Sequence, residues 1–328
     1  QRLHGVLESV LAKDIAHPGA CHLYIHATES TVEPEKADQC AEYLGNAIPG
    51  ASHINHMPSH TYNRIGRWAS AVRANIEAWH SDQRAEYGEG VSYAGTHNLH
   101  MLLFAASMDG QGSIAAMAAE EYADVSPGGV FYQALVALRF GEWEDLLALD
   151  GPPDRPIQRG LWEVARGYAL LRTGDAQGAA EYLSRARATA GSAGDQQFRG
   201  ASASDLIAIV TNLLEGEMLR EEGLSTEALQ LFERAVELQD GLPYSEPEVL
   251  NFAARHWLGD LLLELNRLAE AETVYRRSLE AHPHNGWSLF GLERAIRAQG
   301  RSAEADQVRA EFREAWGRSD TLMRASRF

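Results

Sequence analysis

The stretch GDLLLELNRLAEAETVYRRSLEAHP, residues 259–283, decides the fold of this chain. Apolar residues recur at helical spacing on both sides of Asn266, which suits the left-handed turn residue that ends a helix. Ala271 follows five residues later and is small enough for a second helix to pack closely on the first. Pro283 then closes the unit. The stretch therefore predicts two antiparallel helices joined by a tight turn.

The same turn-and-alanine unit recurs along the whole chain. It occurs at Gly66/Ala71, Gly110/Ala115, Gly174/Ala179, Gly223/Ala228 and Gly300/Ala305, and Asn266/Ala271 is the same unit with asparagine in place of glycine. The spacing from Ala37 to Ala71 and from Ala271 to Ala305 is 34 residues. An inserted loop, residues 241–247, lengthens the repeat that precedes Ala271.

These units resemble the tetratricopeptide repeat, a helix–turn–helix module of about 34 residues. The resemblance implies an all-α fold, a right-handed superhelical solenoid of paired antiparallel helices whose first helices line a concave face. The repeat pattern is strong over residues 160–318 and weaker over 18–150. The first repeat has Val32 at the turn, and residues 127–150 carry Leu146 in place of the alanine.

The proline- and glycine-rich segment 151–156 predicts a linker between two parts of the chain. We expect helical repeats with a histidine-rich metal site in residues 1–150. We expect structural and interacting repeats, without a metal site, in residues 157–328.

The amino-acid composition limits which kinds of partner and which kinds of cysteine site this chain can have. The formal net charge of −17 disfavours nucleic acid, and the longest apolar runs are too short to span a bilayer, so we expect a soluble protein. Cys21 and Cys40 are too few for a disulfide framework or a four-thiolate zinc site, and we interpret both as small buried residues. The chain opens at Gln1 in a helix-like segment, which suggests a start that lacks the true N-terminus. The compartment is not readable.

Histidines are concentrated at one end of the chain, with ten of the thirteen in the first 100 residues. His22/His26 and His56/His60 have i, i+4 spacing, which puts both imidazoles of a pair on one helix face. Such a pair is able to bind one metal ion.

The positions of these histidines within successive repeats support a shared metal site. With the small alanine as position 20, the histidines fall at positions 2, 5 and 9 of successive repeats, and Glu29 falls at position 12. By the resemblance, these positions face the concave groove. The predicted metal ligands are His22, His26, Glu29, His53, His56, His60, His97 and His100, with Glu29 also as a catalytic base on metal-bound water. Asp82, Tyr24, Asn63 and Asn98 are candidates for orienting the rings.

Two features weigh against a metal site. Pro58 lies inside the HMPSH motif and should kink that helix or move its start toward Met57, which would leave His53 and His56 before the helix. A histidine-lined groove is also suited to pH-sensitive binding of a peptide. His256, His282 and His284 look isolated, with His282-Pro-His284 in a solvated turn.

Three segments resemble the signature blocks of an uncharacterised bacterial tetratricopeptide-repeat family. They are HPGACHLYIHATE (residues 17–29), HINHMPSHTYNRIGRW (53–68) and YAGTHNLHMLLFAA (93–106). The resemblance implies further repeats N-terminal to this chain but no agreed reaction.

Imidazole ligands favour copper or zinc, with iron as a further candidate and with enough ligands for two ions; they disfavour Mg²⁺ and Ca²⁺. We therefore expect a metalloenzyme, an oxidoreductase with copper or iron or a hydrolase with zinc, acting on a small molecule or peptide in the groove. The alternative is a non-catalytic scaffold that binds a protein or peptide, through the groove or the C-terminal repeats, or that stores metal.

Overall fold

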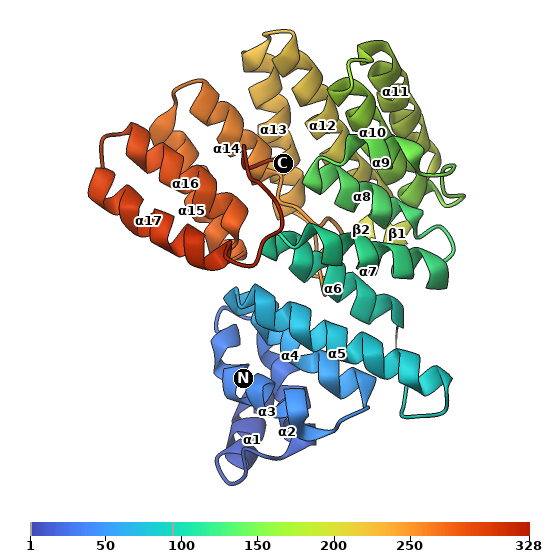
Figure 1. Cartoon of the computed structure of the whole chain (residues 1–328), viewed down its shortest axis with the longest axis vertical. Helices are drawn as coiled ribbons and strands as arrows, with labels where there is room; N and C mark the ends of the chain where they lie inside the picture. Colours follow the sequence, from blue (N-terminus) through green and yellow to red (C-terminus); the bar gives the residue numbers. More distant parts are fainter. Residues whose placement is uncertain (1, 94) are drawn as a thin grey trace.

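The computed structural model describes residues 2–93 and 95–328 (Figure 1). Within these residues the chain forms seventeen α-helices, one short 3-10 helix and one hairpin of two-residue strands. The first half contains α1 (Arg2–Leu11), α2 (Pro18–Glu29), η1 (Pro34–Ala37), α3 (Asp38–Ala47), α4 (Ser52–Ile65), α5 (Trp68–Glu86), α6 (Gly95–Asp109), α7 (Gly112–Val125), α8 (Val130–Phe140) and α9 (Trp143–Ala148). The second half contains α10 (Pro156–Arg172), α11 (Ala176–Ser192), β1 (Gln197–Phe198), β2 (Ala201–Ser202), α12 (Ala203–Glu221), α13 (Ser225–Asp240), α14 (Arg255–Glu264), α15 (Leu268–Ala281), α16 (Gly286–Ala298) and α17 (Ser302–Ala315).

The repeat units behave as the sequence predicts. All six turn residues have a positive φ: Gly66, Gly110, Gly174, Gly223, Asn266 and Gly300. All six alanines that follow are fully buried: Ala71, Ala115, Ala179, Ala228, Ala271 and Ala305. The weak repeat over 127–150 is also a helix pair, α8 and α9, with Gly141 at φ 74° and Leu146 fully buried. The all-α fold of sequential antiparallel pairs is confirmed.

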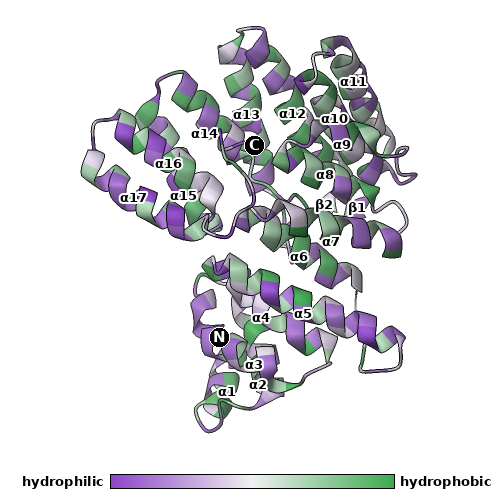
Figure 2. Cartoon of the chain, viewed as in Figure 1, coloured by the Kyte–Doolittle hydropathy of each residue, from purple (hydrophilic) through white to green (hydrophobic). Residues whose placement is uncertain are grey.

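The pairs stack side by side from α2/α3 to α16/α17, and the chain curves round so that its last helices return to the side of α5 and α6 (Figure 1). Apolar residues alternate with hydrophilic ones along most helices, as expected where a helix buries one face against its neighbours (Figure 2). α6 differs, since its residues 98–109 are buried on all sides. Within the described residues, no helix combines the length and apolarity needed to cross a membrane.

The last residues, after α17, fold back along the first helices of several repeats. Arg139 of α8 donates to the carbonyl oxygens of Ser326 and Arg327. The Arg327 side chain forms ion pairs with Asp260 of α14 and Glu217 of α12. The Phe328 ring packs edge-on against Tyr168 and Trp257. This tail therefore covers the inner faces of α8, α10, α12 and α14.

The two cysteines differ from expectation. Both are buried, as predicted, but they are not separate: Cys21 of α2 and Cys40 of α3 form a disulfide with their Cα atoms 4.9 Å apart. Two helices of one repeat pack closely enough to bring the side chains together, which a count of two cysteines does not reveal. The bond ties α2, which carries three of the predicted ligands, to its partner helix.

Candidate metal centre

Three helices carry the histidines that face one another. α2 contributes His22 and His26, and its first turn is capped by the side chain of His17, which accepts from the amide of Ala20. α4 begins at Ser52 with Pro58 inside it, so the predicted shift of its start toward Met57 is wrong. His53, His56 and His60 consequently lie on one helix, and His97 reaches them from α6.

The six imidazole rings form one continuous cluster. Their neighbouring centroids lie between 4.7 and 5.6 Å apart, in the pairs His22/His26, His22/His53, His26/His60, His53/His56, His56/His60, His56/His97 and His60/His97. Two ring nitrogens approach closely in two places: His22 Nε2 lies 3.0 Å from His53 Nε2, and His53 Nδ1 lies 3.2 Å from His56 Nε2. The repeat register predicted convergence of eight groups, these six together with Glu29 and His100.

Three sets of side chains have ligand atoms within 4.8 Å of one another, close enough to share one metal ion. We call them the outer triad, the inner triad and the carboxylate group. The outer triad is His22, His26 and His53; the inner triad is His56, His60 and His97; the carboxylate group is His26, Glu29, His60 and Glu246.

Glu29 connects the two triads. Its Oε1 lies 2.7 Å from His26 Nδ1 and its Oε2 lies 2.6 Å from His60 Nδ1. Burial raises the pKa of the Glu29 carboxyl, but the hydrogen bonds from the two histidines outweigh it and lower that pKa to about 2. The carboxylate is therefore ionised and only accepts, so both histidines donate through Nδ1–H. This tautomer leaves Nε2 of each ring as the nitrogen that is free to bind a metal ion.

Most of the other rings are held neutral. Burial, followed by repulsion from neighbouring histidines, lowers the pKa of His53 to about 4 and that of His97 to about 3. The same causes lower the pKa of His22, and they hold that of His56 well below its usual value of 6.5. Neutral imidazole is the form that binds metal, so at neutral pH these rings are in a state that could hold a metal ion.

His100 lies apart from the three sets. Its Nε2 is 2.6 Å from the Tyr132 hydroxyl, and its ring packs against Tyr132 and Tyr122. His97 and His100 are three residues apart on α6, so they point in directions about 60° apart around the helix axis. That rotation turns His97 toward α4 and His100 toward α8.

The residues predicted to orient the rings make other contacts. Asp82 accepts from Asn98 and Ser92, and Tyr24 donates to Glu8. Asn63 contacts the sulfur of Met101 at 3.8 Å. Within the described residues, none of the four candidates hydrogen bonds to a clustered histidine. Glu29 takes the orienting position instead.

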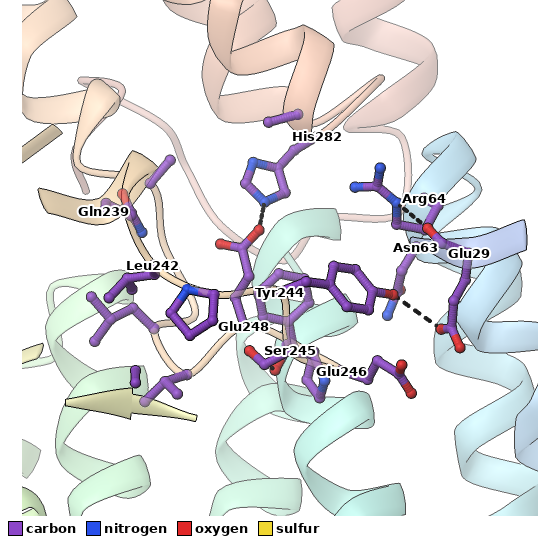
Figure 3. Close-up of a pocket in the computed structure, with 18 of the residues that line it drawn as sticks. Glu29, Asn63, Arg64, Gln239, Leu242, Tyr244, Ser245, Glu246, Glu248 and His282 are labelled. Atoms are coloured by element: carbon purple, nitrogen blue, oxygen red, sulfur yellow. Dashed lines mark hydrogen bonds and ion pairs between the residues drawn. The ribbon is translucent and has the colours of Figure 1, made fainter. Parts of the chain in front are cut away.

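Sequence reasoning missed two residues of the centre. Tyr244 and Glu246 lie in the long connection between α13 and α14, and Figure 3 shows Tyr244 of this connection reaching Glu29. The Tyr244 hydroxyl donates to Glu29 Oε2 at 3.1 Å, and Glu246 Oε2 lies 3.4 Å from His60 Nδ1. The only sequence signal was the inserted loop over residues 241–247, and nothing in it indicates which surface the loop reaches.

A cavity of about 350 Å³ adjoins the centre. Figure 3 shows Arg64 and Glu29 at one end and Gln239 and Leu242 at the other, with Tyr244 and Glu248 between them. Its walls come from α2, α4, α5 and α6, from β2, from α13 and α14 with the connection between them, and from α15. Glu29, His60 and Glu246 belong both to the carboxylate group and to the cavity wall.

The three C-terminal histidines differ in burial, and His282 departs from the prediction. His282 is buried and its Nε2 lies 2.8 Å from Glu248 Oε1, so the expected solvated turn is wrong for this side chain. His256 is fully buried between Arg139 and Ser288. His284 is exposed, as predicted.

Comparison with known proteins agrees with the repeat architecture. Residues 219–289 match the family model of the tetratricopeptide repeat. A solved structure of Naa15/Naa10 bound to HypK-THB is similar at 16% sequence identity and a TM-score of 0.30, a likeness too weak to bear on function. The match covers 96% of this chain and 39% of that chain. By its helix pairs and its repeat match, this chain has the fold of a tetratricopeptide-repeat protein.

Proposed function

We propose that this chain is a metalloenzyme of the tetratricopeptide-repeat fold, in which the outer and inner histidine triads each hold one transition-metal ion. The observation that carries the proposal is the sharing of Glu29 between His26 and His60, at 2.7 and 2.6 Å. One carboxylate fixes one ring of each triad in the tautomer that offers Nε2, as carboxylates do for metal-bound histidines.

Unused nitrogens support metal rather than purely structural histidines. His60 Nε2 and His56 Nδ1 are buried without a hydrogen-bond partner in the described residues. A buried polar atom left in that state costs about 1–3 kcal/mol, which coordination would remove. The 3.0 Å between His22 Nε2 and His53 Nε2 is also near the roughly 3.3 Å expected for two imidazoles on one tetrahedral ion.

The chemistry of the ligands limits which metal ion the site would bind. Neutral imidazoles favour copper or zinc, and also suit iron, over Mg²⁺ and Ca²⁺. Three protein ligands per ion leave a coordination position for water or substrate, which is typical of catalytic rather than structural sites. The reaction is then oxidative with copper or iron and hydrolytic with zinc. Glu29, with both oxygens occupied and a pKa of about 2, serves better as an orienting residue than as a base.

The competing function is a scaffold that binds a protein partner, which the repeat match favours. The chain's own tail already covers the inner faces of α8, α10, α12 and α14, where a peptide would lie in a repeat superhelix.

Elemental analysis of protein purified without added metal tests the proposal, with His60→Ala beside the parent. His80, which is exposed on α5, gives the matched control His80→Ala. We expect up to two ions per chain in the parent and the control, and fewer, with a lower Tm, in His60→Ala. A chelator should lower the parent's Tm and add little in the variant. A parent that carries no metal and gains no stability from Zn²⁺ or Cu²⁺ would overturn the proposal.

A further inference from the structure

The cavity beside the centre has one cation with unused donors. Arg64 donates through Nε to the carbonyl oxygen of Glu29 at 2.8 Å, and within the described residues its two terminal nitrogens make no hydrogen bond or ion pair. The guanidinium lines the cavity wall (Figure 3). A planar guanidinium with two free N–H edges is suited to hold a carboxylate through two parallel hydrogen bonds.

The other charged groups of the cavity are already engaged. Arg255 binds both oxygens of Asp240 at 2.6 Å, and His282 binds Glu248 at 2.8 Å. Glu246 faces His60. Arg64 is therefore the cation at which an incoming anion finds donors without breaking a pair.

Apart from its charged groups and a few polar side chains such as Asn63, Gln239 and Ser278, the wall is apolar and aromatic. Trp68 and Phe104 pack together with their ring centroids 6.3 Å apart, and both line the cavity together with Met101, Leu242, Pro243 and Leu250. A volume of about 350 Å³ accepts a small organic molecule with one ring or a short aliphatic chain. The nearby carboxylates of Glu246 and Glu248 repel a dianion such as a phosphate ester more strongly than an ion with a single negative charge.

Arg64 also lies at a useful distance from the histidines. It follows His60 by one turn on α4, so both side chains lie on one helix face about 6 Å apart. If Arg64 holds the carboxylate of a small molecule, the rest of that molecule lies between the aromatic wall and the residue set that contains His60, the carboxylate group defined above.

We propose that this cavity binds a small apolar or aromatic monocarboxylate through Arg64, and that such a molecule is the substrate class of the adjoining metal centre. Binding itself depends only on the cavity; the role as substrate rests on the proposed function.

Calorimetry with 3-phenylpropionate, 3-phenylpropanol and phenyl phosphate as probes tests the inference on chelator-treated and metal-loaded protein. We expect the carboxylate to bind more tightly than the alcohol or the phosphate ester. Arg64→Met should weaken it on the order of tenfold or more and leave the metal content unchanged. The affinity of Arg64→Lys for the carboxylate should fall between those of the parent and Arg64→Met, because lysine keeps the charge but loses the two parallel hydrogen bonds. The control Arg73→Met changes an exposed arginine of α5 and should bind like the parent.

Equal affinity for the carboxylate and the alcohol, tighter binding of phenyl phosphate, or unchanged binding by Arg64→Met would each overturn the inference. These results are separable from a failure of the metal centre. Loss of metal binding with Arg64-dependent carboxylate binding intact removes the substrate role and keeps the carboxylate site.

Discussion

Glu29 Oε2 lies 2.6 Å from His60 Nδ1, although the two residues are 31 positions apart on different helices. The other oxygen of the same carboxylate reaches His26 at 2.7 Å. Glu29 is nearly fully buried, and the Tyr244 hydroxyl donates to it as well. One side chain thus sets the orientation of a ring in each histidine triad, and the first prediction concerns its loss.

Glu29→Gln should weaken metal binding about 10–100-fold, as is typical when the carboxylate behind a metal-bound histidine is lost. The amide keeps one acceptor but turns N–H donors toward rings that donate from Nδ1. Competition with a chromogenic chelator measures the affinity. Glu246→Gln tells whether the ion is held by the triads or by the carboxylate group. If the triads hold it, metal binding should survive this change. A larger loss of metal affinity than in Glu29→Gln would place the ion among His26, Glu29, His60 and Glu246.

Acid should destabilise the metal-free protein as the pH falls below 6.5. His53 and His97 have the usual pKa of 6.5 when unfolded, and burial lowers it to about 4 and about 3 in the fold. Between these pKa values the unfolded chain binds more protons than the folded chain. The free energy of unfolding therefore decreases as the pH is lowered, by at most about 1.4 kcal/mol per pH unit for each proton.

Glu29 acts in a lower window. Its pKa is lowered from 4.5 to about 2, so its stabilising contribution is complete above pH 4.5 and is lost as the pH falls toward 2. Urea unfolding of chelator-treated protein at pH 7, 6 and 5 isolates the histidines. A free energy of unfolding that stays constant over this range would show that these rings are not held neutral.

Gly291→Ala should destabilise the C-terminal repeats by about 1–3 kcal/mol without changing the metal content, because a Cβ there would overlap the fully buried Tyr275 ring. Gly191→Ala is the matched control, since a Cβ at this position of α11 meets nothing within 4 Å. It should be neutral or slightly stabilising, by up to about 1 kcal/mol. Thermal melts and elemental analysis check both variants; equal Tm values for the two would contradict the packing around Tyr275.

Protein kept under oxidising conditions should show no free thiol after unfolding, because Cys21 and Cys40 are joined. The bond closes a loop with a sequence separation of 19, which stabilises the fold by about 3 kcal/mol in a chain-entropy estimate. A reductant should therefore lower the Tm of the parent but leave that of Cys40→Ser unchanged. Two reactive thiols in the unfolded, unreduced protein would refute the pairing.

The sequence by itself determined the repeat architecture and the convergence of six histidines. Helix turns and close helix contacts are local requirements, met by a left-handed residue such as Gly66 or Asn266 and by a small residue five positions on. A repeat of fixed length then carries His22, His26 and His56 to one face, because equivalent positions of stacked repeats point the same way.

Only the tertiary structure decided the remaining parts of the centre. His97 and His100 differ by a small rotation on one helix, and the packing of α6 against α4 and α8 selects between them. Tyr244 and Glu246 arrive from a connection whose path depends on contacts across more than 180 residues of chain. The tail on the inner faces of the C-terminal repeats is likewise a long-range choice. Periodicity carries no information about where an irregular segment settles, since that depends on the whole surface it meets.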